Sequence, residues 1–435
     1  MVQELVLNLV FVSRTFATFF KYCFLYALGY YNSFECFKKC TEELGKLNIF
    51  FVKALQTLST NANLLTQEQI DYVTVYTDHV PFEPCEVSGE FAQSLQHTAR
   101  EHGHTLEFDR NAAPVKSGMI ALVYSAKLNS KPVVIKVMRA GVKKRLEDAL
   151  RKVHFLVRVV SWFPYVRNLQ LLDIFTENRS NLITQTNFTN EKDNILRMFK
   201  NCEHTEYINV PAVYPEFTNA NDSIIVMSYL EGKKLDELVD DEKDEYCRLL
   251  AKFGMKCLLF NRFYHADLHP GNIVFMKDAD GNFQLGILDY GIMGEITKEE
   301  QAYFHNFFVS IASARDGGAA AADNILDGLV QPMSLMKELS AWDHNNLRAE
   351  IGGIIGEVLH KVRNFTPEDM FRINTVLRKY KLSLSKSFCR IELSLAIADS
   401  VSTKLSHKTS YLENVKEAVN SMFETSIIDC ARDEH

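Results

Sequence analysis

The sequence lacks several features that would assign it to a familiar class of protein. Its nine cysteines form no Cys-x-x-Cys pair, so neither a zinc site nor a disulfide framework is indicated. The formal net charge is −7, which argues against a nucleic-acid partner because such partners usually require a basic face. There is also no internal repeat and no low-complexity tract. The remaining composition, 47% hydrophobic and 24% charged over 435 residues, predicts a globular protein with two lobes or two to three subdomains.

A long uncharged apolar run is also missing from the amino-terminal region. Arg14 follows the apolar residues 5–12, and Lys21 interrupts residues 15–31, which are rich in Phe and Tyr. A membrane-spanning helix needs about 20 apolar residues, and no basic start or cleavage site indicates a signal peptide. We expect residues 1–35 to form a hydrophobic helix on a membrane surface. A membrane span, or packing against the protein's own core, is the alternative.

The most informative stretch is His-Ala-Asp-Leu-His-Pro-Gly-Asn at residues 265–272, followed by Leu-Asp-Tyr-Gly at 288–291. Apolar residues 273–276 and 283–288 flank an Asp-Gly turn, which predicts a β-hairpin. That hairpin would bring Asn272 and Asp289 side by side at one end of a small sheet. The layout is typical of phosphoryl-transfer sites in which Asp267 accepts a proton while Asn272 and Asp289 hold Mg²⁺.

A second group of elements precedes this stretch. Residues 105–108, 121–128 and 131–138 predict three strands, and the third contains Lys136 among β-branched neighbours. A lysine inside such a strand destabilises it unless the amine has a partner. A helix from about residue 190 to 200 offers Glu191 as that partner, and nucleotide phosphates would be the other. A surface lysine on an edge strand is the alternative.

The loop before the second strand lies where a nucleotide-covering loop is expected. When the loop is aligned with the kinase pattern Gly-x-Gly-x-x-Gly-x-Val, with its Val at Val123, the three glycine positions hold Lys116, Gly118 and Ala121. A single glycine limits how closely the backbone can approach phosphate oxygens, but Lys116 could supply charge there. We therefore expect Lys116 to lie within reach of the phosphates; a solvated turn is the alternative.

The remaining segments predict an α+β protein with four parts. Residues 1–35 form the hydrophobic helix, and 36–103 form a helical extension. Residues 104–230 form a lobe with a small antiparallel sheet, and 231–435 form a helical lobe joined to it by a hinge at 229–232. Further helices are expected at 86–102, 141–162 and 237–261, and from residue 297 to the end of the chain.

These motifs resemble the UbiB/ADCK family, the aarF-domain atypical kinases. The resemblance covers about residues 40–415. Residues 265–272 look like the family's His-x-Asp-x-His-Pro-Gly-Asn, and 133–142 are similar to its Val-Ala-Val-Lys-Val-Gln-Arg-Pro-Gly-Val. Residues 51–60 look like its amino-terminal Lys-x-Gly-Gln signature, with Lys53 and Gln56. Small-molecule phosphotransferases share the first motif but lack the extension that carries these two residues.

The resemblance implies a protein-kinase-like, two-lobed fold that binds ATP or ADP with Mg²⁺. Lys53 and Gln56 would project from the extension into the active cleft. Lys136 would bind Glu191 and the nucleotide phosphates. The family is associated with membranes, isoprenoid-lipid metabolism, mitochondria, plastids and bacteria, with ATPase or unorthodox kinase activity. We expect an intracellular, membrane-associated protein; no clear transit peptide indicates an organelle.

The sequence departs from the family pattern at several positions. Leu55 replaces the Gly of Lys-x-Gly-Gln, and residues 116–119 read Lys-Ser-Gly-Met in place of Ala-Ala-Ala-Ser. The family's Glu-x-Asp becomes Gln-Thr-Asn at 185–187, so Lys53 would face the neutral Gln185. A neutral hydrogen bond is about half as strong as a charge-assisted one, which would hold the extension less firmly. Because the phosphoryl-transfer residues are all present, an enzyme is favoured; a nucleotide-binding pseudokinase-like regulatory module and a small-molecule phosphotransferase are the alternatives. Neither the phosphoryl acceptor nor a protein partner is identified.

Overall fold

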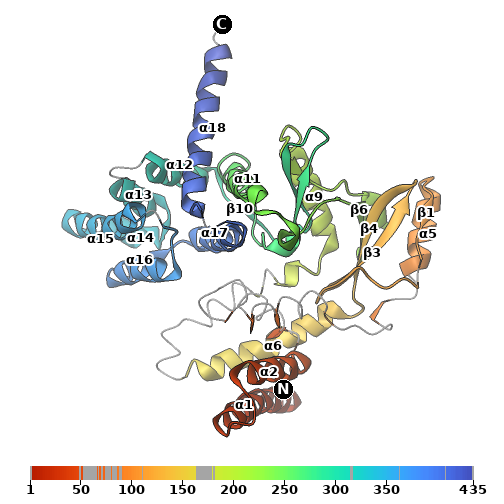
Figure 1. Ribbon diagram of the computed structural model, residues 1–435. Helices are drawn as coiled ribbons and strands as arrows, with labels where there is room; N and C mark the ends of the chain where they lie inside the picture. The colour runs from red at the N-terminus through yellow and green to blue at the C-terminus, as the bar shows by residue number, and fades with distance from the viewer. Residues whose placement is uncertain are drawn as a thin grey trace. The chain divides into compact units, whose positions relative to one another are not determined.

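The structure is a computed structural model, and Figure 1 labels many of its helices and strands. It describes residues 2–48, 50–51, 66, 68–69, 72–73, 80, 86–87, 91–109, 111–162, 179, 182–313, 317–361, 363–406 and 408–433. The chain divides into two compact units. Unit 1 is Met1–Leu196 with Ala212–Tyr229, and unit 2 is Arg197–Pro211 with Leu230–His435. The division falls within helix α9 (Phe188–Asn201).

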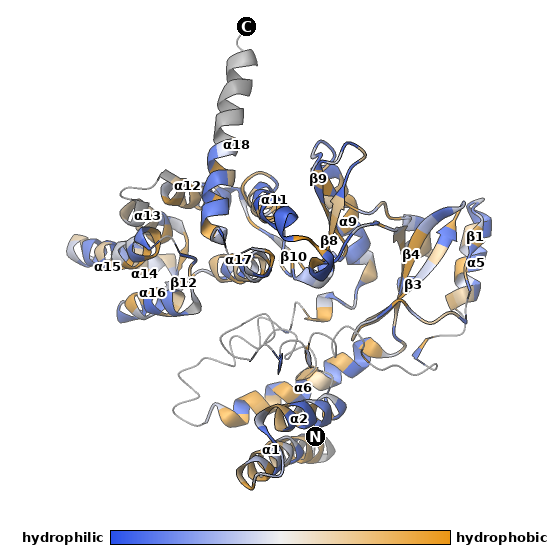
Figure 2. Ribbon diagram, viewed as in Figure 1, coloured by the Kyte–Doolittle hydropathy of each residue, from blue (hydrophilic) through white to orange (hydrophobic). Residues whose placement is uncertain are grey.

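Unit 1 contains a five-stranded antiparallel sheet. The strands are β1 (Leu106–Glu107), β2 (Lys116–Ser117), β3 (Ala121–Leu128), β4 (Lys131–Met138) and β6 (Ile224–Ser228). Their order is β1-β3-β4-β6, with β2 paired to β3. Both long strands are mostly hydrophobic (Figure 2). The predictions for 121–128 and 131–138 are confirmed at the same boundaries.

Alternation along β4 gives the sheet two different faces. Val133, Ile135 and Val137 are buried in a core cluster with helix α5 (Phe91–Glu101). Because side chains alternate along a strand, Lys136 belongs to the opposite face. Helix α10 (Pro215–Ala220) completes this part through the buried Phe217. Helix α5 lies within the predicted helix 86–102.

The amino-terminal helix packs against the protein on one face and is exposed on another. Helix α1 (Val2–Ala27) contacts α2 (Ser33–Leu47) and α6 (Val142–Val160), and Phe11 and Val12 are buried against Leu146 and Leu150. The alternative of internal packing is therefore correct for this face. Other large apolar side chains of α1 remain exposed: Val6, Leu7, Leu9, Val10, Phe19, Phe20, Phe24 and Tyr26. Among the described helices, none combines the length and the apolar character that crossing a bilayer requires.

Unit 2 combines small sheets with many helices. Strands β5 (Ile208–Asn209), β9 (Phe283–Ile287) and β8 (Ile273–Lys277) form one sheet, and β10 (Met293–Glu295) pairs with β7 (Phe263–His265). Two short 3₁₀ helices, Leu235–Glu237 and Pro270–Asn272, flank helix α11 (Asp240–Leu259) and β7 in the chain. The later helices are α12 (Lys298–Ser313), α13 (Gly317–Gly328), α14 (Met333–Glu338), α15 (Ala341–His360), α16 (Pro367–Lys379), α17 (Lys386–Leu405) and α18 (Tyr411–Asp433).

The prediction that the chain is helical from residue 297 onward is wrong in one respect. Strand β11 (Val330–Gln331) pairs with β12 (Ser383–Leu384) between the helices, and their two-residue length gives no periodic signal in the sequence. The α+β class, with small antiparallel sheets and many helices, is confirmed. The four-part division of the chain stays a prediction.

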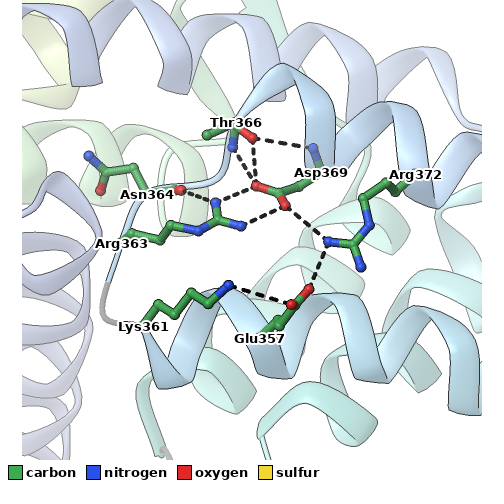
Figure 3. A network of polar contacts seen from close by, with 7 residues as sticks. All are labelled: Glu357, Lys361, Arg363, Asn364, Thr366, Asp369 and Arg372. Carbon is green, nitrogen blue, oxygen red and sulfur yellow. Dashed lines mark hydrogen bonds and ion pairs between the residues drawn. The ribbon is translucent and has the colours of Figure 1, made fainter.

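A polar network joins the end of α15 to the start of α16 (Figure 3). Asp369 accepts hydrogen bonds from both terminal nitrogens of Arg363, at 2.5 and 2.7 Å, and from the amide and hydroxyl of Thr366. Thr366 caps α16 in return, because its hydroxyl accepts the Asp369 amide proton at 3.3 Å. The Asp369 side chain is only 2% exposed, so this carboxylate depends on its partners for compensation.

Candidate active site

Lys136 and Glu191 form a buried ion pair in unit 1. The lysine Nζ lies 2.6 and 2.8 Å from the two carboxylate oxygens of Glu191 and 5.3 Å from the ring centroid of Phe188. The two side chains are 13% and 2% exposed. A buried carboxylate is stable only when it is paired, so Glu191 fixes the direction of the amine. The predicted contact is confirmed; the catalytic role of the pair stays a prediction.

The start of α9 holds Glu191 in position. Asn187 accepts the Asn190 amide proton on its side-chain oxygen at 3.1 Å, and Asn187 also provides the backbone acceptor for Glu191. Asparagine is among the best residues at a helix start. Asn187 therefore caps α9. The family pattern has Asp at this position, and Asn provides the same kind of cap.

The predicted hairpin is present in unit 2. Strands β8 and β9 pair with Ile273 opposite Ile287, and the Leu288 amide donates to the Asn272 carbonyl at 2.9 Å. Asn272 and Asp289 therefore leave the same end of the hairpin, as the sequence predicts.

Asp267 and Asn272 are connected within one short loop. The amide nitrogen of the Asn272 side chain donates to the Asp267 carbonyl at 3.0 Å. His269 closes the loop by accepting the Gly271 amide proton at 3.1 Å on Nδ1. Because its nitrogen end is held, Asn272 retains its amide oxygen as the atom that can bind a cation.

His265 connects the Asp267 loop to Asp289. Its Nε2 lies 2.5 Å from the Asp289 carbonyl oxygen, and its Nδ1 accepts the Asp267 amide proton at 3.2 Å. This arrangement requires Nε2 to carry the proton and Nδ1 to be bare. Burial lowers the pKa of His265, although its hydrogen bond to Asp289 opposes the shift, so the neutral form is favoured.

The oxygen donors of this loop suit a hard cation. Among the described residues, no cluster of three or more His, Cys, Asp or Glu side chains could hold a metal ion by itself. Asn272 and Asp289 offer one amide and one carboxylate, and Asp289 is oriented by a 2.9 Å bond from the Gly291 amide to Oδ1. Mg²⁺ is commonly held by one or two protein ligands together with water and substrate phosphates. The donor set therefore fits Mg²⁺ bound with a nucleotide.

The three positions of the predicted nucleotide loop come together as a tight hairpin in unit 1. Lys116 pairs with Val123 across β2 and β3, and the Gly118 amide donates to the Ala121 carbonyl at 3.0 Å. A Cβ added to Gly118 would lie 3.4 Å from that carbonyl oxygen, which is an ordinary van der Waals contact, so the turn has room for alanine. Binding of phosphate by this hairpin stays a prediction.

The extension residues Lys53 and Gln56 lie outside the described residues, so their predicted approach to the cleft and to Gln185 stays a prediction. The motif at residues 265–272 includes His265 but does not indicate a role for it. Its partner Asp289 lies 24 residues away. The pairing of β7 with β10 that brings them together involves strands of only three residues each.

Comparison with curated proteins gives two relatives described as probable protein kinase UbiB. The protein from Tolumonas auensis is 25% identical over 299 residues, covering 67% of this chain and 54% of that protein. The protein from Sodalis glossinidius is 28% identical over 312 residues, covering 68% and 54%. This chain thus spans about half the length of both relatives.

Solved structures give weaker similarity. The complex of Rv3197 with erythromycin from Mycobacterium tuberculosis is 16% identical with a TM-score of 0.46, covering 83% of this chain and 89% of that one. The Rio2 kinase complex with ADP, Mg²⁺ and phosphoaspartate from Chaetomium thermophilum is 11% identical with a TM-score of 0.29, covering 76% and 95%. Neither score establishes a shared fold by itself.

The family model gives the decisive match. A model of the ABC1 atypical kinase-like domain matches residues 77–321, more than half of the chain. The matched range contains Lys136, Glu191, Asp267, Asn272 and Asp289. The chain belongs to the ABC1 atypical kinase-like family, the UbiB/ADCK family that its motifs resemble.

Proposed function

We propose that the protein is an atypical kinase or ATPase that transfers the terminal phosphoryl group of a Mg²⁺-bound nucleotide and acts at a membrane surface. The observation that carries this proposal is the convergence of Asp267, Asn272 and Asp289 at one end of a hairpin, joined through His265. A kinase-type phosphoryl-transfer site requires a carboxylate that accepts the nucleophile's proton and oxygen ligands for Mg²⁺, and side chains of these types lie together on this loop and hairpin.

Each residue has a distinct chemical task in this proposal. Asp267 accepts the proton of the attacking water or hydroxyl, and Asn272 and Asp289 hold Mg²⁺. Mg²⁺ held by these two residues would neutralise charge that develops on the transferred phosphoryl group. Lys136 binds the nucleotide phosphates while Glu191 keeps its amine oriented, and Lys116 adds positive charge. By resemblance, Lys53 and Gln56 project from the extension into the active cleft, and the nucleotide is ATP or ADP.

The test is Mg²⁺-dependent phosphate release from ATP by wild type and Asp289→Asn. Asp280→Asn is the matched control, because it makes the same change at the exposed turn of the same hairpin. We expect Asp289→Asn to lower turnover at least about a hundredfold and Asp280→Asn to leave it unchanged. If wild-type turnover is no greater than that of Asp289→Asn while nucleotide still binds tightly, the proposed enzymatic activity is contradicted. The alternative of a pseudokinase-like regulatory module then remains.

The membrane part of the proposal is supported by helix α1. Its exposed side chains include Phe19, Phe20 and Phe24, between 53% and 64% exposed. A groove of about 420 Å³ between α1 and α2 has three cationic residues and one acidic residue in its lining: Arg14, Lys21, Lys46 and Glu43. Aromatic residues beside a basic surface are typical of helices that lie in the interface of anionic membranes. A role in isoprenoid-lipid metabolism follows from the resemblance alone.

A further inference from the structure

Arg139 forms hydrogen bonds with two residues of the hairpin that carries Gly118. The Arg139 backbone amide donates to the Ile120 carbonyl at 2.9 Å. Its side-chain Nη2 donates to the Ser117 hydroxyl at 2.9 Å. Ser117 is the last residue of β2 and Ile120 immediately precedes β3, so Arg139 is hydrogen-bonded to the hairpin on both sides of Gly118.

Arg139 also connects this hairpin to the segment that precedes helix α5. Its Nη1 donates to Glu86 at 2.8 Å, and Arg145 donates to the second oxygen of the same carboxylate at 2.5 Å. The Glu86 carbonyl accepts the Ala140 amide proton at 2.7 Å. The Arg139 side chain is 3% exposed, so its positive charge depends on these partners.

Ser117 is the point where these contacts meet. Its hydroxyl accepts from Arg139 and donates to the Val80 carbonyl at 2.5 Å, while its carbonyl accepts the Val80 amide proton at 2.9 Å. The hydroxyl therefore acts both as a donor and as an acceptor. The family pattern has alanine at this position, which lacks the hydroxyl. We call Val80, Glu86, Ser117 and Arg139 the clamp.

We propose that Ser117 and Arg139 are positioning residues, and that the clamp holds the turn at 118–121 in the conformation that binds nucleotide. The residues of this turn have backbone groups that must be held still to meet phosphate oxygens. A turn released from the clamp loses conformational entropy when nucleotide binds, and this loss weakens the affinity for nucleotide. This proposal rests on the proposed function for its nucleotide, whereas the mechanical role of the clamp does not.

The experiment compares the full chain with Ser117→Ala, which removes only the hydroxyl, and with Ser117→Thr, which restores it on a residue suited to a strand. Ser125→Ala is the matched control, because Ser125 is an exposed residue of β3 in the same sheet. Thermal unfolding first checks that each variant is folded. Hydrogen exchange is then followed at the amides of Val80, Gly118 and Arg139 without nucleotide, and the Kd for Mg²⁺-ATP is measured by calorimetry.

We expect Ser117→Ala to speed exchange at these three amides and to raise the Kd about threefold to tenfold. Ser117→Thr and Ser125→Ala should remain within about twofold of wild type. Unchanged exchange in Ser117→Ala overturns the clamp, whether or not nucleotide binds. Faster exchange with an unchanged Kd overturns the positioning role. A wild type that binds no nucleotide overturns the proposed function together with that role, while the exchange result still decides the mechanical one.

Discussion

The Nε2 atom of His265 and the carbonyl oxygen of Asp289 lie 2.5 Å apart, and the other ring nitrogen of His265 accepts the Asp267 amide proton. One imidazole therefore joins the two segments that supply the acidic residues of the candidate site. Protonation of Nδ1 would break its hydrogen bond with the Asp267 amide, because two donors would then face each other. The site is compatible only with neutral His265.

This relationship predicts a pH dependence of stability. The pKa of folded His265 is below its ordinary value of 6.5, mainly because of burial. As pH falls through 6.5, the unfolded chain binds a proton on His265 that the folded chain does not bind. His265 therefore makes the free energy of unfolding fall as pH decreases. We expect urea unfolding between pH 7.5 and 5.5 to show a smaller loss of stability in His265→Gln than in wild type. His97→Gln is the control, because His97 is 74% exposed. Equal pH slopes in wild type and His265→Gln would contradict the prediction.

Helix α1 allows the membrane proposal to be tested without removing its buried face. We expect the double variant Phe20→Ser, Phe24→Ser to lose at least about tenfold in binding to vesicles containing anionic phospholipid, because each buried phenylalanine contributes about 1.5–3 kcal/mol. Flotation of the vesicles is the measurement. Phe371→Ser is the control, because Phe371 is 64% exposed on α16 in unit 2. Equal flotation of all three proteins would exclude this face as the membrane contact.

The groove beside α1 predicts a dependence on lipid charge. Arg14→Gln with Lys46→Gln removes two of the three cationic residues that line it. A basic residue near an anionic surface contributes about 1 kcal/mol, so vesicle binding should fall about tenfold or more at low salt and less at high salt. Flotation on neutral vesicles should not change. A loss that is equal on neutral and anionic vesicles would contradict a charge-based contact.

The network around Asp369 predicts a large effect on stability. Asp369→Asn removes the negative charge that the Arg363 guanidinium faces, and we expect the free energy of unfolding to fall by about 2–4 kcal/mol. Glu357→Gln is the control at the edge of the network, where both partners are 43% exposed, and should cost less than about 1 kcal/mol. Urea unfolding at pH 7 measures both; equal losses would contradict a special role for the buried carboxylate.

Glu392 on α17 predicts an effect of opposite sign. Burial raises the pKa of Glu392 from 4.5 to about 7. The unfolded chain therefore loses this proton first, and stability falls as pH rises between these two values. Glu392→Gln should raise the free energy of unfolding by about 1–3 kcal/mol at pH 8 and leave it unchanged at pH 4. Glu338→Gln, an exposed change on α14, should have no effect at either pH. A Glu392→Gln variant no more stable than wild type at pH 8 would refute this assignment.

The local parts of the site could be predicted from the sequence, and the distant couplings could not. The β-branched residues around Lys136 predicted the strand that carries it, and the Asp-Gly turn predicted the hairpin beside Asn272. Both signals lie within a few residues of the site they position. The contacts of Arg139 with Glu86 join residues 53 positions apart, and a buried arginine has no periodic signature of its own.

The two faces of α1 also constrain how this segment can vary. Phe11 and Val12 cover Leu146 and Leu150, whereas Phe19, Phe20 and Phe24 face outward. Substitutions at covered positions should reduce the yield of folded protein, and substitutions at outward positions should spare it. A mutational scan along α1 should therefore show intolerance that recurs about every three to four residues on the covered face, at the period of the helix.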